Sequence, residues 1–399
     1  MKKNFYIYFF ITFCMFQSLP IMARTVSVMS YNVENLFDNV HDEGKKDWTY
    51  LPLEVKKKSS EVQAYCKSQR VPMYRDECFN LDWSDKILSK KIQQISKVIR
   101  SYDNGKGPDI IVVQEVENLN VLTMLRDQGL ANLGYQEVVL LEGPDVRGID
   151  VGMISRFPLA SPAILHPIDL SELSNRSGGF SSKTRGILEA TFDIDGALVT
   201  IFGNHWSSQS NIDETRLIEA RTLYNAAKNV KNSAVLALGD FNTIESDSPH
   251  GINEYILSSS KEYSFYDAVD PLHSTKSDDE MDVNHFINRD VDALVNNNIN
   301  EGSHWYKGKW QFLDHIFLMK STTFNPDDKD ANCSIHTCVG PVWNTFAVHK
   351  ADFMMREITY VDRRTGKTTK YKVPWRFDAN KGQGYSDHLP ITLQFLVNY

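Results

Sequence analysis

The sequence predicts a domain of mixed α and β structure, in which helices cover the outer faces of packed sheets. Many short runs rich in β-branched and aromatic residues are interspersed with only a few segments of helical periodicity. The chain has 399 residues, of which 42% are hydrophobic and 24% charged, as in ordinary globular proteins with a full core. This length allows one large domain or two ordinary ones.

Nine runs have the composition of β-strands and are bounded by Gly, Pro, Asp or Asn residues. They cover residues 25–31, 109–114, 135–141, 150–155, 186–193, 198–204, 234–238, 313–319 and 390–396. Between two of these runs, Asp195 and Gly196 form a strong hairpin signal.

Three segments show helical periodicity: residues 85–102, 119–130 and 212–230. Ser84 is placed to cap the first helix. One face of that helix is apolar and carries Ile87, Leu88, Ile92, Ile95, Val98 and Ile99. The buried stripe expected for the third helix is Leu217, Ala220, Tyr224 and Ala227.

Three polar stretches look like insertions, at residues 39–83, 243–311 and 321–383. Long loops of this kind inside a compact fold are usually functional or disordered. The acidic run at residues 278–280 is better explained as a solvated loop than as a calcium site, because it lacks a regular ligand spacing.

The N-terminal segment has the pattern of a secretory signal peptide. Lys2 and Lys3 precede an apolar run over residues 5–16, and Pro20 then leads to the small residue Ala23. We therefore expect a signal peptide over residues 1–23, a domain over residues 24–399, and export to the periplasm or the medium. The alternative is an uncleaved membrane anchor, which the shortness of the run disfavours. We expect no transmembrane segment in the mature chain.

The cysteine count predicts disulfide bonds. Cys14 falls in the signal segment, which leaves Cys66, Cys78, Cys333 and Cys338. An even number in an exported protein indicates two disulfides, and proximity in the sequence favours Cys66–Cys78 and Cys333–Cys338. The other two pairings stay open. A zinc site is disfavoured, because the spacings do not give paired C-x-x-C ligands.

The formal net charge of −8 argues against binding nucleic acid through bulk charge. This weighs mildly against a nuclease. It does not decide the matter, because a metal site and local Arg and Lys groups can serve a phosphate.

Four short motifs of polar residues follow or interrupt the predicted strands. They are Ser30-Tyr31-Asn32, Gln114-Glu115, Gly239-Asp240-Phe241-Asn242 and Ser386-Asp387-His388. Together they supply the carboxylates, carboxamides and imidazole that are needed to hold a hard divalent cation and split a phosphate ester.

Two of these motifs predict oxygen ligands and a base. Glu115 ends an apolar strand, where a carboxylate is costly unless it meets a cation or stays solvated. Strand alternation places Asp240 and Asn242 on one face, which suits a general base with an anion-orienting partner. Glu117 should face another way and belong to the start of the following helix.

The histidine and arginine candidates lie near the ends of other strands. His388 can be held as imidazolium by Asp314, while His315 should point to the opposite face. His205 ends another strand, where a half-buried structural role is as well supported as catalysis. Arg147 presents a guanidinium suited to phosphate, with a surface ion pair to Asp150 as its alternative.

These residues resemble the endonuclease/exonuclease/phosphatase superfamily, which includes deoxyribonuclease I, apurinic endonucleases, neutral sphingomyelinases and inositol polyphosphate phosphatases. The resemblance runs from Val26 to about Leu396, and motif order and spacing both match. It implies a four-layer α/β/β/α sandwich of the deoxyribonuclease I type, with the site at one edge of the two sheets. It also implies dependence on Mg²⁺ or Mn²⁺, with Ca²⁺ as a further option. Residues 147–150 are similar to exported bacterial members labelled as extracellular nucleases.

The resemblance implies a role for each matching position. Glu115, Asn32 and Asp240 would hold the metal with Asp387 near it, and Asn32 would also face the phosphate. Asp240 and Asn242 would act at the attacking water and the phosphate.

The imidazoles and Arg147 complete this scheme. His388 would act paired with Asp314, and His205 falls where the deoxyribonuclease I group carries a second histidine. Arg147 would assist at the phosphate.

The resulting hypothesis is an exported, metal-dependent endonuclease that hydrolyses DNA and perhaps also RNA, and acts as a monomer. The alternative is a sphingomyelinase-like phospholipase C or another small-molecule phosphoesterase, which the aromatic residues Trp343, Phe346, Trp375 and Phe377 would allow. A long exposed hydrophobic hairpin would favour the lipid substrate, and a basic groove beside the site would favour the nuclease. A binding protein that has lost catalysis is a third option, disfavoured because every expected polar residue is present.

Overall fold

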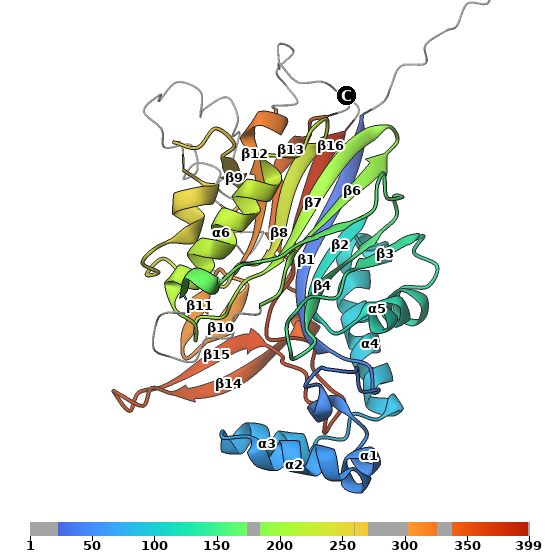
Figure 1. Ribbon diagram of the computed structural model, residues 1–399, viewed down its shortest axis with the longest axis vertical. Coiled ribbons are helices and arrows are strands. Elements are labelled where there is room, and N and C mark those ends of the chain that lie inside the picture. The colour runs from blue at the N-terminus through green and yellow to red at the C-terminus, as the bar shows by residue number, and fades with distance from the viewer. Residues whose placement is uncertain (1–22, 174–183, 259, 270–301, 325–336, 398–399) are drawn as a thin grey trace, which may run out of the picture.

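The structure is a computed structural model that describes residues 23–173, 184–258, 260–269, 302–324 and 337–397 (Figure 1). Within these residues, two six-stranded sheets are covered by helices on their outer sides. Residues 1–22 of the predicted signal peptide, Cys333 and the acidic run at residues 278–280 lie outside the described residues.

The first sheet consists of β1 (Arg24–Leu36), β2 (Ile110–Val116), β3 (Glu137–Leu140), β4 (Asp150–Ser155), β13 (Gly340–Val348) and β16 (Ile391–Val397). Their order is β13-β16-β1-β2-β4-β3. At its centre β1 runs parallel to β2 and antiparallel to β16. The carboxyl ends of β1 and β2 therefore meet at one edge.

The second sheet consists of β5 (Ile164–His166), β6 (Ile187–Ile194), β7 (Ala197–His205), β8 (Ala234–Asp240), β9 (Phe265–Asp267) and β12 (Asp314–Met319). Their order is β5-β6-β7-β8-β12-β9. β7 and β8 run parallel, while β12 returns antiparallel beside β8. The hairpin predicted at Asp195 and Gly196 is confirmed, because β6 and β7 pair up to Ile194 and Ala197 on its two sides.

Apolar side chains of the two sheets fill one continuous core between them, including Val112, Met153, Val199 and Leu236. α4 (Asp85–Arg100) and α5 (Leu119–Met124) pack on the first sheet, and α6 (Asp213–Ala227) packs on the second (Figure 1). A turn of π-helix, Leu125–Gly129, continues α5. The four layers predicted for the fold are confirmed.

The buried stripe predicted for α6 is partly wrong. Ala220 and Ala227 are buried, but Leu217 and Tyr224 are only half-buried. The buried face carries Ile218 and Leu223, and also the charged residues Arg216 and Glu219. Both are satisfied there, since Arg216 pairs with Asp247 and Glu219 accepts hydrogen bonds from Ser207, so apolar periodicity misplaced the stripe.

The stretches predicted as insertions contain elements of their own. Residues 39–83 form α1 (Leu53–Lys58), α2 (Ser60–Ser68) and α3 (Pro72–Asn80), and the Cys66–Cys78 disulfide joins α2 to α3. β9 and β13, which lie in the other two stretches, are edge strands of the main sheets. Two further hairpins are β10 (His304–Tyr306) with β11 (Lys309–Gln311), and β14 (Met355–Val361) with β15 (Thr368–Pro374).

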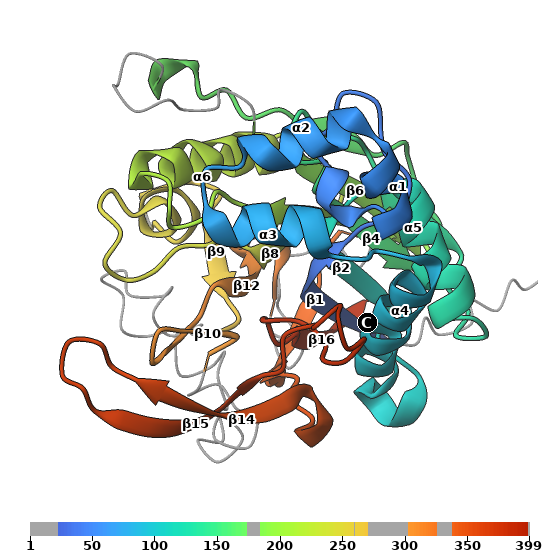
Figure 2. The same ribbon diagram turned by 90° about the horizontal axis from the view of Figure 1, so that it is seen from below.

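The α1–α3 segment and the β14–β15 hairpin lie at the same end of the molecule (Figure 1 and Figure 2). Cys338 is also disulfide-bonded. Among the described residues, no helix combines the length and the apolar character that crossing a membrane requires.

Candidate active site

The strand register brings the predicted polar residues to one edge of the two sheets. Asp240, the last residue of β8, lies opposite His205 of β7 on one side and Asp314 of β12 on the other. In the facing sheet, Asn32 of β1 lies beside Gln114 of β2, immediately before Glu115. The side chains of His205, Asp240 and Asp314 therefore form a row in the second sheet. This row faces Asn32 of β1 and Glu115 of β2 in the first sheet.

Residues at this edge adopt a left-handed backbone conformation that is uncommon outside glycine. Glu34 and Asn35 have φ of 54° and 60°, Glu115 has φ of 63°, and Asn242 has φ of 48°. The pairing of β1 with β2 and of β2 with β4 is irregular here, so the chain bulges where the polar groups gather. Strained residues of this kind cluster at functional sites.

Asn32 joins the two sheets. Its Nδ2 donates to Asp240 Oδ2 at 3.1 Å and lies 3.5 Å from Glu115 Oε1. Its Oδ1 accepts from the Glu34 amide at 3.0 Å, and the Asn35 amide donates to Glu115 Oε2 at 3.1 Å. Asn32 and Glu115 are therefore held in place by backbone amides from the bulge in β1.

His388 and Asp314 form the expected pair, with His388 Nδ1 2.8 Å from Asp314 Oδ2. His388 Nε2 lies 3.8 Å from Asp240 Oδ2. Burial lowers the pKa of His388, but Asp314 and Asp240 outweigh it and hold that pKa well above its ordinary value. His388 is therefore an imidazolium that Asp314 orients and that points at Asp240.

His205 approaches the same carboxylates from the other side. Its Nε2 lies 3.8 Å from both Glu115 Oε1 and Asp240 Oδ2, and its Nδ1 has no hydrogen-bond partner in the described part of the chain. Burial, followed by the charges of Arg185 and Arg147, lowers the pKa of His205 well below its ordinary value. This second imidazole is neutral.

The structure gives Asn242 two contacts. Its backbone amide donates to Asp240 Oδ1 at 2.9 Å, while its side-chain Nδ2 donates to the Trp206 carbonyl at 3.0 Å. Burial raises the pKa of Asp240 to about 7, against the lowering effect of His388. Asp240 is thus poised to exchange a proton near neutral pH.

Asp387 is surrounded by charged side chains that come from distant parts of the sequence. Burial raises the pKa of Glu34 to about 8 and Asp387 adds to that rise, while Lys91 and Arg376 oppose it. Arg376 donates to the Glu34 carboxylate, and the buried Lys91 donates to the Tyr385 carbonyl. The net effect of His388, Arg376 and other cations keeps the pKa of Asp387 below its ordinary value despite burial.

Sequence reasoning missed Glu34, Lys91, His304 and Arg376. Strand alternation from Asn32 could have found Glu34, since the two are separated by one residue. No local signal marks the others. The His304 ring lies 4.6 Å from the His388 ring because the two residues share an isolated β-bridge.

Arg147, which was predicted to act at the phosphate, contacts Asp145. Its side chain is 58% exposed and lies 3.5 Å from Asp145 Oδ2, in a loop before β4. It makes no hydrogen bond with the cluster around Asp240 within the described residues. Its charge still acts on His205.

The donor set fits a divalent metal ion. Ligand atoms of Asp240, Asp314 and His388 all lie within 4.8 Å of one another. Asp314 and His388 already bind each other, so a cation would be held by the oxygen atoms of Glu115, Asn32 and Asp240. Each accepts a hydrogen bond in the structure and has further lone pairs for a cation. Mg²⁺ needs only one or two carboxylates beside water, and Glu115 is one-fifth exposed at the mouth of the cluster. This acidic and histidine cluster is consistent with divalent metal binding.

A second acidic group, Asp42, Asp47 and Glu117, lies away from this cluster. Glu117 accepts from the Asp38 amide, Asp47 from the Asp42 amide, and Asp42 from Asn118. Glu117 therefore has different partners from Glu115, as predicted, although regular strand alternation would place residues 115 and 117 on one face. The left-handed backbone at Glu115 and the irregular pairing there break the alternation. Burial and Asp38 raise the pKa of Glu117 to about 10.

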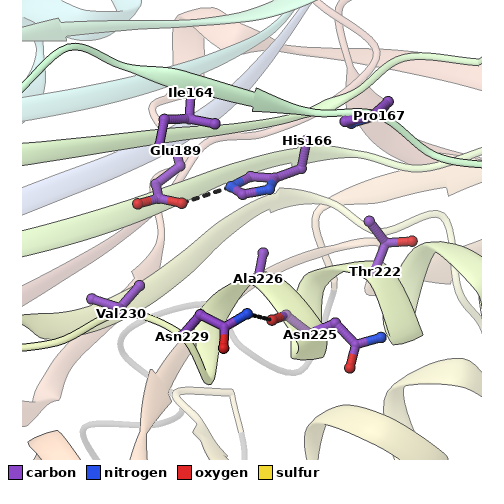
Figure 3. A pocket seen from close by; sticks show the side chains of 9 residues that line it. All are labelled: Ile164, His166, Pro167, Glu189, Thr222, Asn225, Ala226, Asn229 and Val230. Carbon is purple, nitrogen blue, oxygen red and sulfur yellow. Dashed lines mark hydrogen bonds and ion pairs between the residues drawn. The ribbon is translucent and has the colours of Figure 1, made fainter.

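A pocket on the outer side of the second sheet contains another histidine (Figure 3). His166 Nε2 lies 2.6 Å from Glu189 Oε2, in the space between β5, β6 and α6. No residue of the cluster around Asp240 lines this pocket. The His166–Glu189 pair is therefore separate from the candidate active site.

Comparison with known proteins agrees with this architecture. Over residues 70–396 the chain matches the model of the endonuclease/exonuclease/phosphatase family. No curated protein matches the sequence.

Several solved structures are similar at low identity. A family member from Bacteroides thetaiotaomicron is 12% identical, with 95% of this chain and 100% of that chain covered and a TM-score of 0.45. A humanized D. rerio TDP2 is 13% identical, with 93% and 98% covered and a TM-score of 0.46. ANGEL2, a 2',3'-cyclic phosphatase, is 12% identical, with 96% and 99% covered and a TM-score of 0.48.

The two facing sheets with their flanking helices and the buried acidic and histidine cluster define a phosphoesterase of the deoxyribonuclease I-like fold. The chain belongs to the endonuclease/exonuclease/phosphatase family.

Proposed function

We propose that this protein is an exported, metal-dependent phosphodiesterase that cleaves DNA and, as a second substrate, RNA. The phosphodiesterase chemistry rests on Asp240, which accepts hydrogen bonds from Asn32 and Asn242. Asp240 also faces two imidazoles, the charged ring of His388 and the neutral ring of His205. The choice of nucleic acid over lipid rests on the character of the β14–β15 hairpin.

The chemistry divides among the residues of the cluster. Asp240, whose pKa is raised to about 7, would orient and deprotonate the attacking water. The His388 imidazolium would donate a hydrogen bond to a phosphoryl oxygen as charge develops. A Mg²⁺ or Mn²⁺ ion held by Glu115 and Asn32 would neutralise charge on the phosphoryl group. His205 would offer the reacting group a neutral imidazole.

The β14–β15 hairpin supports a polyanionic substrate. Its cationic side chains, all exposed, are Arg356, Arg363, Arg364, Lys367, Lys370 and Lys372, against the two acids Glu357 and Asp362. Lys370 pairs with Glu357 at 2.8 Å and Lys372 with Asp352 at 2.6 Å. The remaining four have no ion pair within the described residues, in a chain whose net charge is −8.

The same hairpin does not support insertion into a lipid layer. Its Tyr360 and Tyr371 rings pack against Trp305, at 5.6 Å and 5.5 Å between centroids. Val361 is its large exposed hydrophobic residue. Trp343 and Phe346 are buried in the main core, and Trp375 and Phe377 are partly buried against core clusters. The aromatic residues that allowed a lipid substrate are thus used in packing.

A hydrolysis panel tests this proposal. Purified protein lacking residues 1–23 is offered plasmid DNA, RNA, sphingomyelin and an inositol phosphate, with Mg²⁺ and with EDTA. We expect metal-dependent nicking of the plasmid and slower cleavage of RNA. Release of phosphocholine with intact DNA would contradict the nuclease and establish the lipid hydrolase. Export is tested separately by N-terminal sequencing of the mature protein, which we expect to begin at Arg24.

A further inference from the structure

A cleft of about 340 Å³ beside the candidate active site contains two guanidinium groups. Arg147 and Arg185 line it together with Asp145 and the serines Ser207 and Ser208. Ser207 follows His205 by two residues, so the cleft adjoins the His205 side of the cluster.

Arg185 is buried without a close counter-ion. It is 5% exposed, and its Nε has no hydrogen-bond partner in the described part of the structure. Its ion pair with Asp145 is long, because Asp145 Oδ2 lies 3.9 Å from that Nε, beyond hydrogen-bond distance. Leaving a buried cation unpaired is costly, so a group that pairs with it on binding would be strongly favoured.

Asp145 cannot neutralise both arginines. Its Oδ1 accepts from the Arg147 amide at 2.7 Å, and its Oδ2 lies 3.5 Å from the Arg147 guanidinium. Two further acids act on the charge of Arg185 without lining the cleft. Glu115 accepts from the Asn35 amide, and Glu219 from the Ser207 amide and hydroxyl. Among the residues that line the cleft, the carboxylate of Asp145 thus serves two guanidinium groups, which leaves this lining with an excess of positive charge.

We propose that this cleft binds a second phosphate group of the substrate, distinct from the phosphate attacked at Asp240. Arg147 and Arg185 present planar forks that match phosphate oxygens, and the Ser208 hydroxyl lies at the same cleft. The proposal rests on the proposed function, and it gives a reason for preferring nucleotides, which carry successive phosphates, over a lipid with one phosphodiester. The second phosphate is a flanking phosphodiester or a terminal phosphomonoester.

Dinucleotides separate this subsite from the reacting site. The substrates are TpT, pTpT with a 5′-phosphate, TpTp with a 3′-phosphate, the trinucleotide TpTpT, and bis(4-nitrophenyl) phosphate, which has one phosphate. We expect the native protein to cleave TpTpT and one of the two phosphorylated dinucleotides with a kcat/KM about 10- to 100-fold above that for TpT, as expected for a charged hydrogen-bond partner. The preferred end identifies the side of the scissile bond on which the cleft lies.

Two variants and a control connect this preference to the cleft. Arg185→Gln and the exposed Arg147→Gln should each reduce the preference at least about fivefold. The preference is measured as the ratio of kcat/KM for the substrate with the added phosphate to kcat/KM for TpT, so that an effect common to both substrates, such as one through His205, cancels. Arg156→Gln is the matched control, because Arg156 is a partly buried arginine paired with Asp109 at 2.8 Å near the start of β2. If Arg185→Gln does not fold, Arg147→Gln carries the test.

The outcomes distinguish this proposal from the proposed function. No preference for any added phosphate, or a preference that survives both cleft variants, would overturn the subsite while leaving the phosphodiesterase intact. If the native protein hydrolyses none of the substrates, the subsite is tested by the binding of thymidine 3′,5′-bisphosphate, measured by calorimetry. Binding that weakens about tenfold in Arg147→Gln supports the subsite, and unchanged or absent binding refutes it.

Discussion

Strand β12 carries a histidine–aspartate pair on each of its faces. On one face, Asp314 Oδ2 lies 2.8 Å from His388 Nδ1. On the other, His315 Nδ1 lies 2.9 Å from Asp267 Oδ2. Neighbouring carboxylates raise the pKa of both histidines against the effect of burial. The two pairs have similar distances and the same direction of pKa shift, and β12 contributes to them through the adjacent residues Asp314 and His315.

Their surroundings differ. The His388 ring faces Asp240, with Asn32 and Glu115 next to it, so its second nitrogen points at groups that can hold water, metal and phosphate. The His315 ring is enclosed by Phe241 and Phe317, at 5.8 Å and 5.2 Å between centroids. A raised histidine pKa therefore does not identify a catalytic group; the groups near the free nitrogen do.

The largest effect is expected for His388→Ala. Removing the imidazolium takes away the donor that would stabilise developing charge on the phosphate, so kcat should fall by about 10²- to 10⁴-fold. Turnover of plasmid DNA under saturating Mg²⁺ measures this loss, and circular dichroism checks the fold. A correctly folded variant with near-native turnover would remove His388 from the scheme.

A smaller effect is expected for Asp314→Asn, which keeps the size of the side chain but removes the charge that raises the pKa of His388. We expect kcat to fall by about 10- to 100-fold at neutral pH. Because His388 then loses its proton at a lower pH, the loss should be greater at pH 8 than at pH 6. A pH–rate profile measures this change. A uniform loss at all pH values would indicate that Asp314 only orients the ring.

The sequence predicted those parts of the site that depend on strand periodicity. Asn32, Glu115 and Asp240 lie in apolar strands and His388 lies just before one, and alternation correctly separated Asp314 from His315. These inferences work because the period of a strand is local.

Other features depend on contacts between distant segments. Arg185 has no motif around it, and its importance comes from the shortage of carboxylates near it in space. The pairing of Arg376 with Glu34 joins residues 342 positions apart. The stripe of α6 was misplaced because its buried face is partly polar, and such residues are recognised only through their partners.

The smallest effect on activity, and the sharpest test of the comparison, is expected for His315→Ala. This substitution leaves Asp267 without its histidine partner and opens space beside Phe241 and Phe317, so the free energy of unfolding should fall by about 3 kcal/mol. Because the folded pKa of His315 is raised, the pair contributes fully below the unfolded pKa of about 6.5, and its contribution falls as pH rises through the folded value. Urea unfolding at several pH values should therefore show the largest destabilisation at acidic pH. The variant should keep kcat within about twofold of native at temperatures where it is folded, since its ring faces away from Asp240. A loss of turnover comparable to that of His388→Ala would show instead that the two faces of β12 are coupled in catalysis.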